Sequence, residues 1–407
     1  MRVLILNPGS SSLKSSVVEA SGLRPGVPVA PLAKIDVDWG VDATAAIATA
    51  PAAGASNPGL ADEIRRLLAR YEAAGVDPKS LGAVGYRVVH GGTRFREPTL
   101  ITPAVVGELD ALRELAPLHN GVAVATIRGG LAAAPQLPHV AVFDTAFHAT
   151  LPEDAFRYPV PESWFREWGI RRFGFHGLSV AWAAQRAATL IADDALGSEY
   201  QGGPASQPSI VVAHLGSGCS VTAVEGGRSV ATSMGLTPLE GLMMGTRSGS
   251  IDPGIVFNLV REGHLTVEEV ADRLDHASGL MGVSGKTSDV RELLTLEAAG
   301  DAAAALALTM FVRRAAECIA AAATSLRNLD AIVFTGGIGE NAATLRSRIV
   351  ARLQSLGAGP IGEERVVADA ILTPAATRPA VLRIEAREDL IVAREAARAV
   401  EANGRER

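Results

Sequence analysis

Cysteine, lysine and long apolar runs are all scarce in this chain of 407 residues. The two cysteines, Cys219 and Cys318, are too few for a disulfide framework and give no pair at zinc-ligand spacing. The sequence also lacks a His-Glu-x-x-His motif, and its longest nearly unbroken apolar run, 302–312, is well short of the ~18–20 residues that cross a bilayer. These absences argue against a disulfide-rich secreted domain, a zinc enzyme of known motif and a membrane-spanning protein.

The composition that remains is that of a globular protein of two or three domains, at ~100–200 residues per domain. Hydrophobic residues make up 48% and charged residues 20% of the chain, so there is ample apolar surface to bury. The net charge of −6 argues against nucleic-acid binding, which needs a basic face. The apolar stretch Val3–Leu6 is too short for a signal peptide, so we expect a cytoplasmic protein.

A strand, a turn of small residues and a second strand occur twice, about 205 residues apart in the sequence. The first unit covers 3–18, with its turn at 7–12, and the second covers 210–225, with its turn at 216–220. This repetition predicts a duplicated domain. Between and after these units, helical spacing at 104–118, 302–326 and 390–402 alternates with apolar strands at 139–143 and 331–334, which predicts an α/β fold. The composition of 194–208 predicts a surface loop.

Three glycine- or serine-rich turns, 7–12, 216–220 and 336–341, each follow an apolar strand. The backbone N–H groups of such turns converge and bind anions, phosphate above all. A single turn of this kind is more often structural, but three of them favour a nucleotide. None matches the P-loop or the Rossmann fingerprint.

Several charged residues adjoin these turns or end apolar strands. Arg87 can grip a carboxylate or a phosphate, or form a surface ion pair. Asp144 ends an apolar strand, where ligands of open α/β sheets bind, although it could also cap a helix. For His90 and His148 we favour a structural role. For His176 we give equal weight to a structural role and to a functional one, because the adjacent glycine would permit close approach of a ligand.

The segment 232–253 is too rich in Gly, Met, Ser and Thr for a simple helix or strand, so we expect an ordered functional loop. Within it, Arg247 has small residues on both sides and could lie against a ligand. Because there is no zinc-type cluster, a hard cation held by carboxylates and phosphates, such as Mg²⁺, fits better.

Taken together, these segments resemble the acetate kinase family from Val3 to about Arg394. The blocks that carry the resemblance are 7–14, 87–92, 141–148, 171–177, 214–253, 278–291 and 334–341. The resemblance implies two duplicated ribonuclease-H-like (actin-like ATPase) α/β domains flanking a cleft. One would comprise 1–148 with 386–407, because the C-terminal helix returns to it, and the other 149–385.

The resemblance further implies reversible, ATP-dependent phosphorylation of acetate to acetyl phosphate by direct in-line transfer. It implies Mg²⁺, with Mn²⁺ as a possible substitute, a cytoplasmic homodimer, and no nucleic-acid or membrane partner. Three alternatives stay open: a propionate or butyrate kinase, a nucleotide-switch protein on the same fold, and a relative that uses pyrophosphate. The small residues at 337–339 favour ATP over pyrophosphate.

Roles carry over by position. The resemblance assigns catalysis to Asp144, His176 and Arg247. It assigns substrate binding to Arg87 and to an apolar pocket of Val89, Leu118, Phe175 and Pro238. It assigns the metal to Asn7 and Glu388. It assigns the nucleotide and its phosphates to Ser10, Ser12, Lys14, His214, Leu215, Gly216, Ser217, Gly218, Asp289, Val290, Arg291, Gly337, Ile338, Gly339, Glu340 and Asn341.

The chain departs from the family pattern at three places. Ser217 and Cys219 stand where Asn and Ser are usual, so we expect the second turn to form with one fewer side-chain contact to phosphate. Leu178-Ser179-Val180 replaces the usual Thr-Ser-His after the His176 segment, which changes the support of that histidine. The residues 385–387 replace the usual Pro-Thr-Asn and change the setting of Glu388.

Overall fold

The computed structural model describes residues 1–9, 12–38, 58–115, 117–195, 207–375 and 377–405. By its internal contacts the chain divides into two compact units. Unit 1 comprises Met1–Ala149, Phe175–Trp182 and Arg387–Arg407, and unit 2 comprises Thr150–Gly174 and Ala183–Ala386. We keep 1–148 with 386–407, and 149–385, as a proposed division into ribonuclease-H-like domains.

Unit 1 is built on a six-stranded mixed sheet of order β3-β2-β1-β4-β6-β5. The strands are β1 (Arg2–Pro8), β2 (Ser12–Glu19), β3 (Ala33–Asp38), β4 (Leu81–Val88), β5 (Thr99–Leu100) and β6 (His139–Phe143). Strands β1, β2 and β3 form an antiparallel meander, and β1, β4 and β6 run parallel. The carboxyl ends of the three parallel strands therefore meet at one edge of the sheet, where ligands bind in folds of this class.

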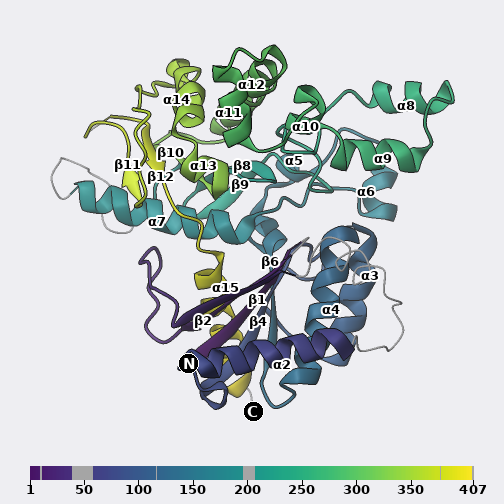
Figure 1. Ribbon diagram of the computed structural model, residues 1–407, viewed down its shortest axis with the longest axis vertical. Helices are drawn as coiled ribbons and strands as arrows, with labels where there is room; N and C mark the ends of the chain where they lie inside the picture. Colours follow the sequence, from purple (N-terminus) through teal and green to yellow (C-terminus); the bar gives the residue numbers. More distant parts are fainter. Residues whose placement is uncertain (10–11, 39–57, 116, 196–206, 376, 406–407) are drawn as a thin grey trace. The chain divides into compact units, whose positions relative to one another are not determined.

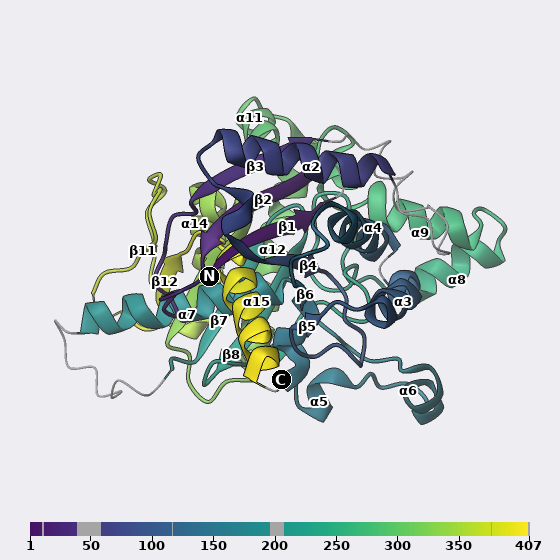
Figure 2. The same ribbon diagram turned by 90° about the horizontal axis from the view of Figure 1, so that it is seen from below.

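Helices cover both faces of this sheet (Figures 1 and 2). Helix α4 (Pro117–Ala133) and helix α2 (Pro58–Ala73) bury apolar side chains such as Ile64 and Ile127 against Leu4 and Tyr86. Helix α15 (Glu388–Arg405) packs on β1, β4 and β6 from the opposite face, where a Cβ added to Gly85 would press on Val392. This packing holds the first residue of α15 at the sheet.

Unit 2 contains a second six-stranded sheet of order β11-β12-β10-β7-β8-β9. Its strands are β7 (Ile210–Leu215), β8 (Cys219–Glu225), β9 (Arg228–Thr232), β10 (Ala331–Thr335), β11 (Ala370–Ile371) and β12 (Ala380–Arg383). Strands β7, β8 and β9 form an antiparallel meander, and β7, β10 and β12 run parallel. The five-strand pattern of unit 1 is thus repeated, which confirms the duplicated α/β fold predicted from the sequence.

The helices of unit 2 centre on α12 (Ala302–Ala323), which packs on β7 and β8 and is itself covered by other helices. Asp301 caps its first turn by accepting from the Ala304 N–H. The remaining helices are α5 (Glu153–Phe156), α6 (Glu162–Trp168), α7 (Gly177–Ala195), α8 (Pro253–Arg261), α9 (Val267–His276), α10 (Gly279–Ser284), α11 (Val290–Ala298), α13 (Gly336–Asn341) and α14 (Ala343–Ala351). The first six residues of α7 belong to unit 1.

Three expectations about single elements are corrected. The predicted helix 104–118 is broken: α3 (Pro103–Ala111) passes into the 3-10 turn η2 (Leu112–Leu115), and α4 begins at a proline, which can start a helix but not continue one. The nearly all-round apolar composition of 302–326 predicts a helix buried on every side, but Leu306 and Met310 of α12 are exposed. The segment 336–341 is the short helix α13 rather than a hairpin turn. Most of the predicted loop 194–208 lies outside the described residues.

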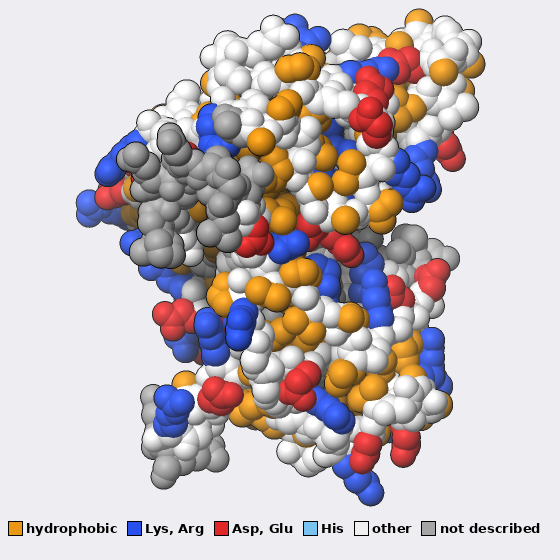
Figure 3. Space-filling view, turned by 90° about the vertical axis from the view of Figure 1, so that its left-hand side faces the viewer, with side chains coloured by type: hydrophobic (Ala, Val, Ile, Leu, Met, Phe, Trp, Pro, Cys, Tyr) orange, Lys and Arg blue, Asp and Glu red, His pale blue; other side chains and the backbone are white. Residues whose placement is uncertain are grey.

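Within the described ranges, no helix is both long and apolar enough to cross a membrane. On the face shown in Figure 3, acidic and basic side chains are interspersed.

The 3-10 turn η3 (Asp144–Thr150) follows β6 directly and is fixed by a buried histidine. The ring Nε2 of His148 lies 2.9 Å from the carbonyl oxygen of Phe175, and only 1% of the residue is exposed. Because the carbonyl can only accept, Nε2 carries the proton. Burial lowers the pKa of His148 to about 4, so the ring is neutral at pH 7.

We expect His148 to make the protein less stable in mild acid. The unfolded chain binds a proton at its ordinary pKa of about 6.5 and the folded chain only near 4, so the stabilisation is complete above pH 6.5 and is lost as the pH falls toward 4. Between pH 7.5 and 5.0 this amounts to about 2 kcal/mol. Denaturant unfolding of the wild type and of His148→Gln over this range should give curves that converge by that amount, and parallel curves would contradict the assignment.

Candidate active site

A buried ion pair lies at the carboxyl edge of the unit 1 sheet. Arg87 of β4 donates from Nε to Oδ1 of Asp144 at 2.9 Å and from Nη2 to Oδ2 at 2.7 Å. Strands β4 and β6 pair in parallel with Arg87 opposite Val142, so Asp144, two residues further on, follows on the same face of the sheet. Asp144 is only 1% exposed, and two parallel N–H···O bonds fix the plane of the guanidinium.

The third side of the same guanidinium faces Glu388, the first residue of α15. Nη1 of Arg87 lies 2.9 Å from Oε2 of Glu388 and 3.4 Å from Oδ1 of Asn7 at the end of β1. The Nδ2 group of Asn7 completes the ring by donating to Oε2 of Glu388 at 3.3 Å. The structure thus brings together four residues that sequence analysis assigned to substrate, catalysis and metal, although Asn7 and Glu388 are 381 positions apart.

The electrostatics of this cluster favour a cation. Burial alone would lower the pKa of Arg87, but the charges of Asp144 and Glu388 outweigh burial and raise it, so the guanidinium is always charged. One guanidinium facing two carboxylates leaves one excess negative charge. Anionic substrates would be repelled by that excess unless further positive charge were supplied.

The segment around His176 approaches the Asp144 turn so closely that a side chain is excluded. A Cβ added to Gly177 would overlap the carbonyl oxygen of Asp144. This glycine therefore permits close approach of the η3 backbone, whereas the sequence suggested close approach of a ligand. His176 is the one non-glycine residue of the described ranges with a positive φ, 58°, a backbone conformation that is costly for most residues. The start of α7 is therefore held against η3, and the carbonyl of His176 receives the Val180 N–H.

The hairpin between β1 and β2 places Lys14 beside this cluster. Lys14 lies directly opposite Asn7 in the antiparallel ladder, so the two side chains share a face of the sheet, and Lys14 is exposed. The turn is closed by the Gly9 N–H, which donates to the carbonyl oxygen of Ser12 at 2.8 Å. Ser10 lies outside the described residues.

Two of the four residues expected to form the apolar pocket belong to unit 1 and are described with their side chains. Val89 is partly exposed between the buried Val88 and His90, as expected of a residue on the same face as Arg87. Phe175 is buried, with its ring edge-on to the imidazole of His90 at 5.4 Å between centroids. His90 is fully buried. The side chain of Leu118 is outside the described part, and Pro238 belongs to unit 2.

In unit 2 the turn between β7 and β8 packs against the start of α13. A Cβ added to Gly336, whose φ is +79°, would lie 2.7 Å from the carbonyl oxygen of Leu215. A Cβ added to Gly216 would lie 3.8 Å from the Gly337 nitrogen and 3.7 Å from Nε2 of His214. Two of the three predicted nucleotide segments thus adjoin each other across this turn.

Cys219, one of the departures from the family pattern, is buried behind the same turn. Its Sγ lies 3.3 Å from the carbonyl oxygen of Gly216, which the thiol can use as an acceptor. Burial raises the pKa of Cys219 to about 12, so the thiol is protonated and unreactive at pH 7.

The third segment that the sequence assigns to the nucleotide begins at Asp289, the N-cap of α11. Asp289 accepts from the Arg291 N–H at 2.8 Å and pairs with its guanidinium, so this carboxylate also has the capping role expected of an aspartate before a helix. The hydrogen bond to Arg291 lowers the pKa of Asp289 to about 2. Val290 is buried behind this cap.

The segment 233–252 carries Arg247 and contains no helix or strand, as the sequence predicted. Nη1 of Arg247 donates to the carbonyl oxygen of Pro238 at 3.3 Å, and Nε lies 3.9 Å from Asp275. Gly279, with a φ of +61°, lets α10 approach so closely that a Cβ there would meet the carbonyl oxygens of Met244 and Arg247. Backbone carbonyls of the loop therefore contact α10, and the Arg247 side chain links two parts of the loop by donating to the Pro238 carbonyl.

A second clamp on this loop was missed by sequence analysis. Arg172 donates to the carbonyls of Ser233 and Met234 and pairs with Glu240 at 2.6 Å, and Glu240 also accepts from the hydroxyl of Tyr158. Arg172 lies within the block 171–177 that the sequence singles out, but its partners follow more than 60 residues later, which no local pattern reveals.

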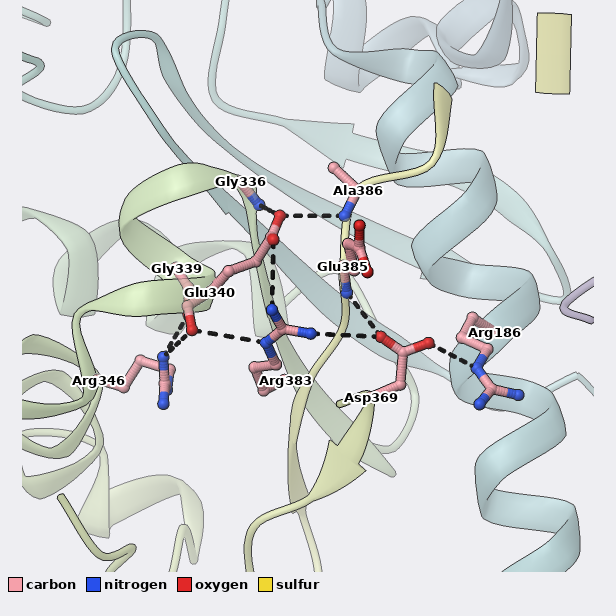
Figure 4. Close-up of polar contacts among 9 residues, drawn as sticks. All are labelled: Arg186, Gly336, Gly339, Glu340, Arg346, Asp369, Arg383, Glu385 and Ala386. Atoms are coloured by element: carbon pink, nitrogen blue, oxygen red, sulfur yellow. Dashed lines mark hydrogen bonds and ion pairs between the residues drawn. The ribbon is translucent and has the colours of Figure 1, made fainter. Parts of the chain in front are cut away.

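Glu340 is the centre of a second missed network, shown in Figure 4. Its Oε1 accepts from the Gly336 N–H and from the Ala386 N–H, each at 3.0 Å, and Oε2 lies 3.4 Å from Nη2 of Arg383. Asp369 lies on the other side of Arg383, at 3.6 Å. A buried arginine in the otherwise apolar strand β12 was the signal that could have pointed to this network.

The oxygen donors of the unit 1 cluster fit a magnesium ion better than a zinc ion. Among the described residues, no group of three or more His, Cys, Asp and Glu side chains could hold a metal by itself. Mg²⁺ is ordinarily bound by only one or two carboxylates together with substrate phosphates and water. Asp144, Glu388 and the amide oxygen of Asn7 are donors of this kind, and their excess negative charge suits a cation.

Comparisons with known proteins agree over nearly the whole chain. Residues 2–394 match the model of the acetokinase family. The chain is 43% identical to the acetate kinase of Deinococcus radiodurans, covering 98% of each chain, and 41% identical to that of Gloeobacter violaceus, covering 97% of this chain and 98% of the relative.

Solved structures give the same result for the fold. A propionate kinase from Francisella tularensis has a TM-score of 0.81 at 33% identity, and the acetate kinase of Porphyromonas gingivalis has 0.79 at 29%; each comparison covers 98% of this chain and 99% of the other. The match over residues 2–394, together with the duplicated sheets, leads to one conclusion: the chain belongs to the acetokinase family.

Proposed function

We propose that this chain is an acetate kinase, which transfers the γ-phosphoryl group of ATP to the carboxylate of acetate and forms acetyl phosphate and ADP. The observation that carries the proposal is the buried Arg87–Asp144 pair at the carboxyl edge of parallel strands, with Glu388 and Asn7 on its open side. The excess negative charge of this cluster suits a divalent cation, which together with the guanidinium would meet the anionic oxygens of the substrates. The relatives named above support acetate as the acceptor.

The chemistry needs alignment and charge stabilisation more than it needs a base. A carboxylic acid such as acetic acid is already ionised at pH 7, so its oxygen is a nucleophile without proton removal. Asp144 is therefore not a general base in this direction; it holds the guanidinium of Arg87 in one plane. In a direct transfer, the acetate oxygen forms a bond to the γ-phosphorus while the bond to the ADP oxygen breaks.

Arginine and histidine side chains offset the repulsion between the two anions. We assign Arg87 to the carboxylate of acetate, and Arg247 and His176 to the oxygens of the phosphoryl group in the transition state. A divalent cation, Mg²⁺ or in its place Mn²⁺, would neutralise charge on the phosphates when bound. Asn7, Asp144 and Glu388 are the residues that would hold it. Because acetyl phosphate is a high-energy acyl phosphate, the same residues serve the reverse reaction toward ATP.

The assembly and location of the protein belong to the same proposal. We assign a homodimer, which is supported by α8: none of its residues is buried within the described chain, and Phe257 is 63% exposed. An exposed apolar helix of this kind favours a protein partner over solvent. We also assign a cytoplasmic location, with acetate and ATP as the substrates and no nucleic-acid or membrane partner.

The direct test is trapping of the acyl phosphate with hydroxylamine. The purified chain should form it from acetate with ATP, and with propionate and butyrate at kcat/KM values lower by about 10–200-fold per added methylene. Pyrophosphate should not replace ATP. A preference for propionate or butyrate would assign a longer-chain kinase, and the absence of any acyl phosphate despite nucleotide binding would favour a nucleotide-switch protein.

Replacing Asp144 by Asn should lower kcat by at least ~10²-fold, the usual effect of losing one preorganised electrostatic contact. The amide has one acceptor oxygen, and its NH₂ group would face the guanidinium of Arg87, so the plane of that guanidinium is no longer fixed. Nucleotide affinity, measured by calorimetry with ADP, should change little.

A matched control for this variant is Asp110→Asn. Asp110 is another carboxylate of unit 1 with little exposure, 8% for its side chain, and it pairs with both Arg113 and Arg128. Its replacement should lower the melting temperature and leave kcat nearly unchanged. If Asp144→Asn retained wild-type kcat, or if both variants lost it equally, Asp144 would have only a structural role.

Gly337 and Gly336 allow a paired test of the nucleotide site. A Cβ added to Gly337 would meet nothing within 4 Å, so Gly337→Ala should fold normally and weaken ADP binding by blocking the close approach of the ligand. Gly336→Ala should instead lower stability, because of its positive φ and the carbonyl of Leu215. Calorimetry and thermal melting separate the two effects, and unchanged ADP affinity in Gly337→Ala would remove this segment from the site.

A further inference from the structure

We propose that Glu340 is a positioning residue, whose carboxylate sets the backbone of the nucleotide segment 337–341 through contacts to other parts of unit 2. The inference rests on the proposed function, which places ATP at this segment, and it adds a role for a side chain that does not itself need to touch the nucleotide. The geometry points to this role because the carboxylate is already fully engaged by the protein, as Figure 4 shows.

One oxygen of Glu340 joins two backbone segments that are 50 residues apart. Oε1 accepts from the Gly336 N–H, the first of α13, and from the Ala386 N–H, the last residue of unit 2. Burying a carboxylate without hydrogen-bond donors costs free energy, so these two N–H groups stabilise Glu340 in its place. The position of the turn at Gly336 is thereby tied to the chain segment that follows β12.

The other end of α13 is held by two arginines. Nη1 of Arg346, which is 1% exposed, donates at 2.8 Å to the carbonyls of both Gly339 and Glu340. Arg383 approaches the same carbonyl of Glu340 with Nε at 3.5 Å and its carboxylate with Nη2. The Gly336 N–H is therefore bonded by the Glu340 carboxylate, and the carbonyls at the other end of α13 are bonded by Arg346. Neither of these side chains needs to contact the ligand.

The ligand face itself is left open. Gly337 is exposed and has no neighbour near its missing Cβ, while Gly336 and Gly339 are buried against Leu215 and Ala213. On its exposed side the segment is bonded only within itself among the described contacts, through Nδ2 of Asn341, which donates to the carbonyl oxygen of Gly337 at 2.9 Å. The network behind the segment therefore supplies its side-chain contacts to other parts of unit 2. A misplacement of about 1 Å in such a support can cost up to ~10²-fold in rate.

Asp369 provides a control that belongs to the same network. It is 11% exposed, against 12% for Glu340, and it also faces Arg383. Its remaining contacts are the Glu385 N–H at 2.8 Å and Nε of Arg186 at 2.8 Å, and none of its contacts in Figure 4 reaches α13. Loss of Asp369 therefore disturbs the arginine and the folding energy without releasing the nucleotide segment.

Conservative replacement gives a second, graded test. In Glu340→Gln the amide oxygen can still accept from Gly336 and Ala386, while the NH₂ group loses the ion pair with Arg383. In Glu340→Ala both the acceptor and the charge are lost. A positioning role predicts a graded effect on the nucleotide, whereas a purely structural role predicts a graded effect on melting temperature alone.

The experiment compares Glu340→Ala, Glu340→Gln, Asp369→Asn and the wild type in the full chain, by ADP calorimetry, thermal melting, and KM for ATP and for acetate. We expect Glu340→Ala to raise the ADP dissociation constant and KM for ATP about tenfold, Glu340→Gln less than threefold, and neither to change KM for acetate by more than twofold. Asp369→Asn should lower the melting temperature and leave both nucleotide parameters within twofold.

Equal changes in Glu340→Ala and Asp369→Asn, or a lowered melting temperature in Glu340→Ala with wild-type nucleotide parameters, would overturn the positioning role. If Glu340→Ala does not fold, the comparison of Glu340→Gln with Asp369→Asn decides by the same criterion. Failure of the proposed function looks different: the wild type would then form no acyl phosphate, or Gly337→Ala would bind ADP as tightly as the wild type.

Discussion

The ion pair between Arg87 and Asp144 is the interaction on which the unit 1 site depends. Both groups lie at the carboxyl edge of neighbouring parallel strands, and the register of β4 and β6 brings them to the same face. A buried pair of this kind is costly to form and costlier to break, because a lone buried charge costs about 3–5 kcal/mol. The pair therefore fixes the orientation of the Arg87 guanidinium, and Glu388 and Asn7 lie next to its Nη1 atom.

A steric constraint fixes the same region from the other side. The start of α7 lies so close to η3 that position 177 admits only glycine, and the preceding residue, His176, takes up a backbone conformation that is unfavourable for most residues. The hydrogen bond from His148 to the carbonyl of Phe175 ties the same two segments together. Packing in this place therefore determines where the His176 backbone lies.

Sequence analysis was most successful where local pattern decides the structure. Apolar runs and small-residue turns gave both hairpins and their duplication, because strand formation there needs only neighbours in the chain. The break of the predicted helix near Leu112 and the helical form of 336–341 depend on local competition between turn types, which periodicity does not resolve. Arg383 and Asp369 were missed for a different reason: the role of each depends on partners from distant segments, and each reads locally as an ordinary strand or surface residue.

The charges of the unit 1 cluster explain why orientation, and not attraction, is its main contribution. A guanidinium that faced solvent alone would bind any anion, but here two carboxylates more than neutralise it. In the proposed function, substrate binding therefore requires positive charge from elsewhere, such as Lys14 on the neighbouring strand or a bound cation. The guanidinium adds direction through its fixed N–H groups. An enzyme that joins two anions gains when one group supplies the charge and another the orientation. A site that held acetate by charge alone would bind phosphate or another carboxylate equally well. In the proposed function, selectivity falls to the apolar pocket expected from the sequence, in which Val89 lies two residues after Arg87.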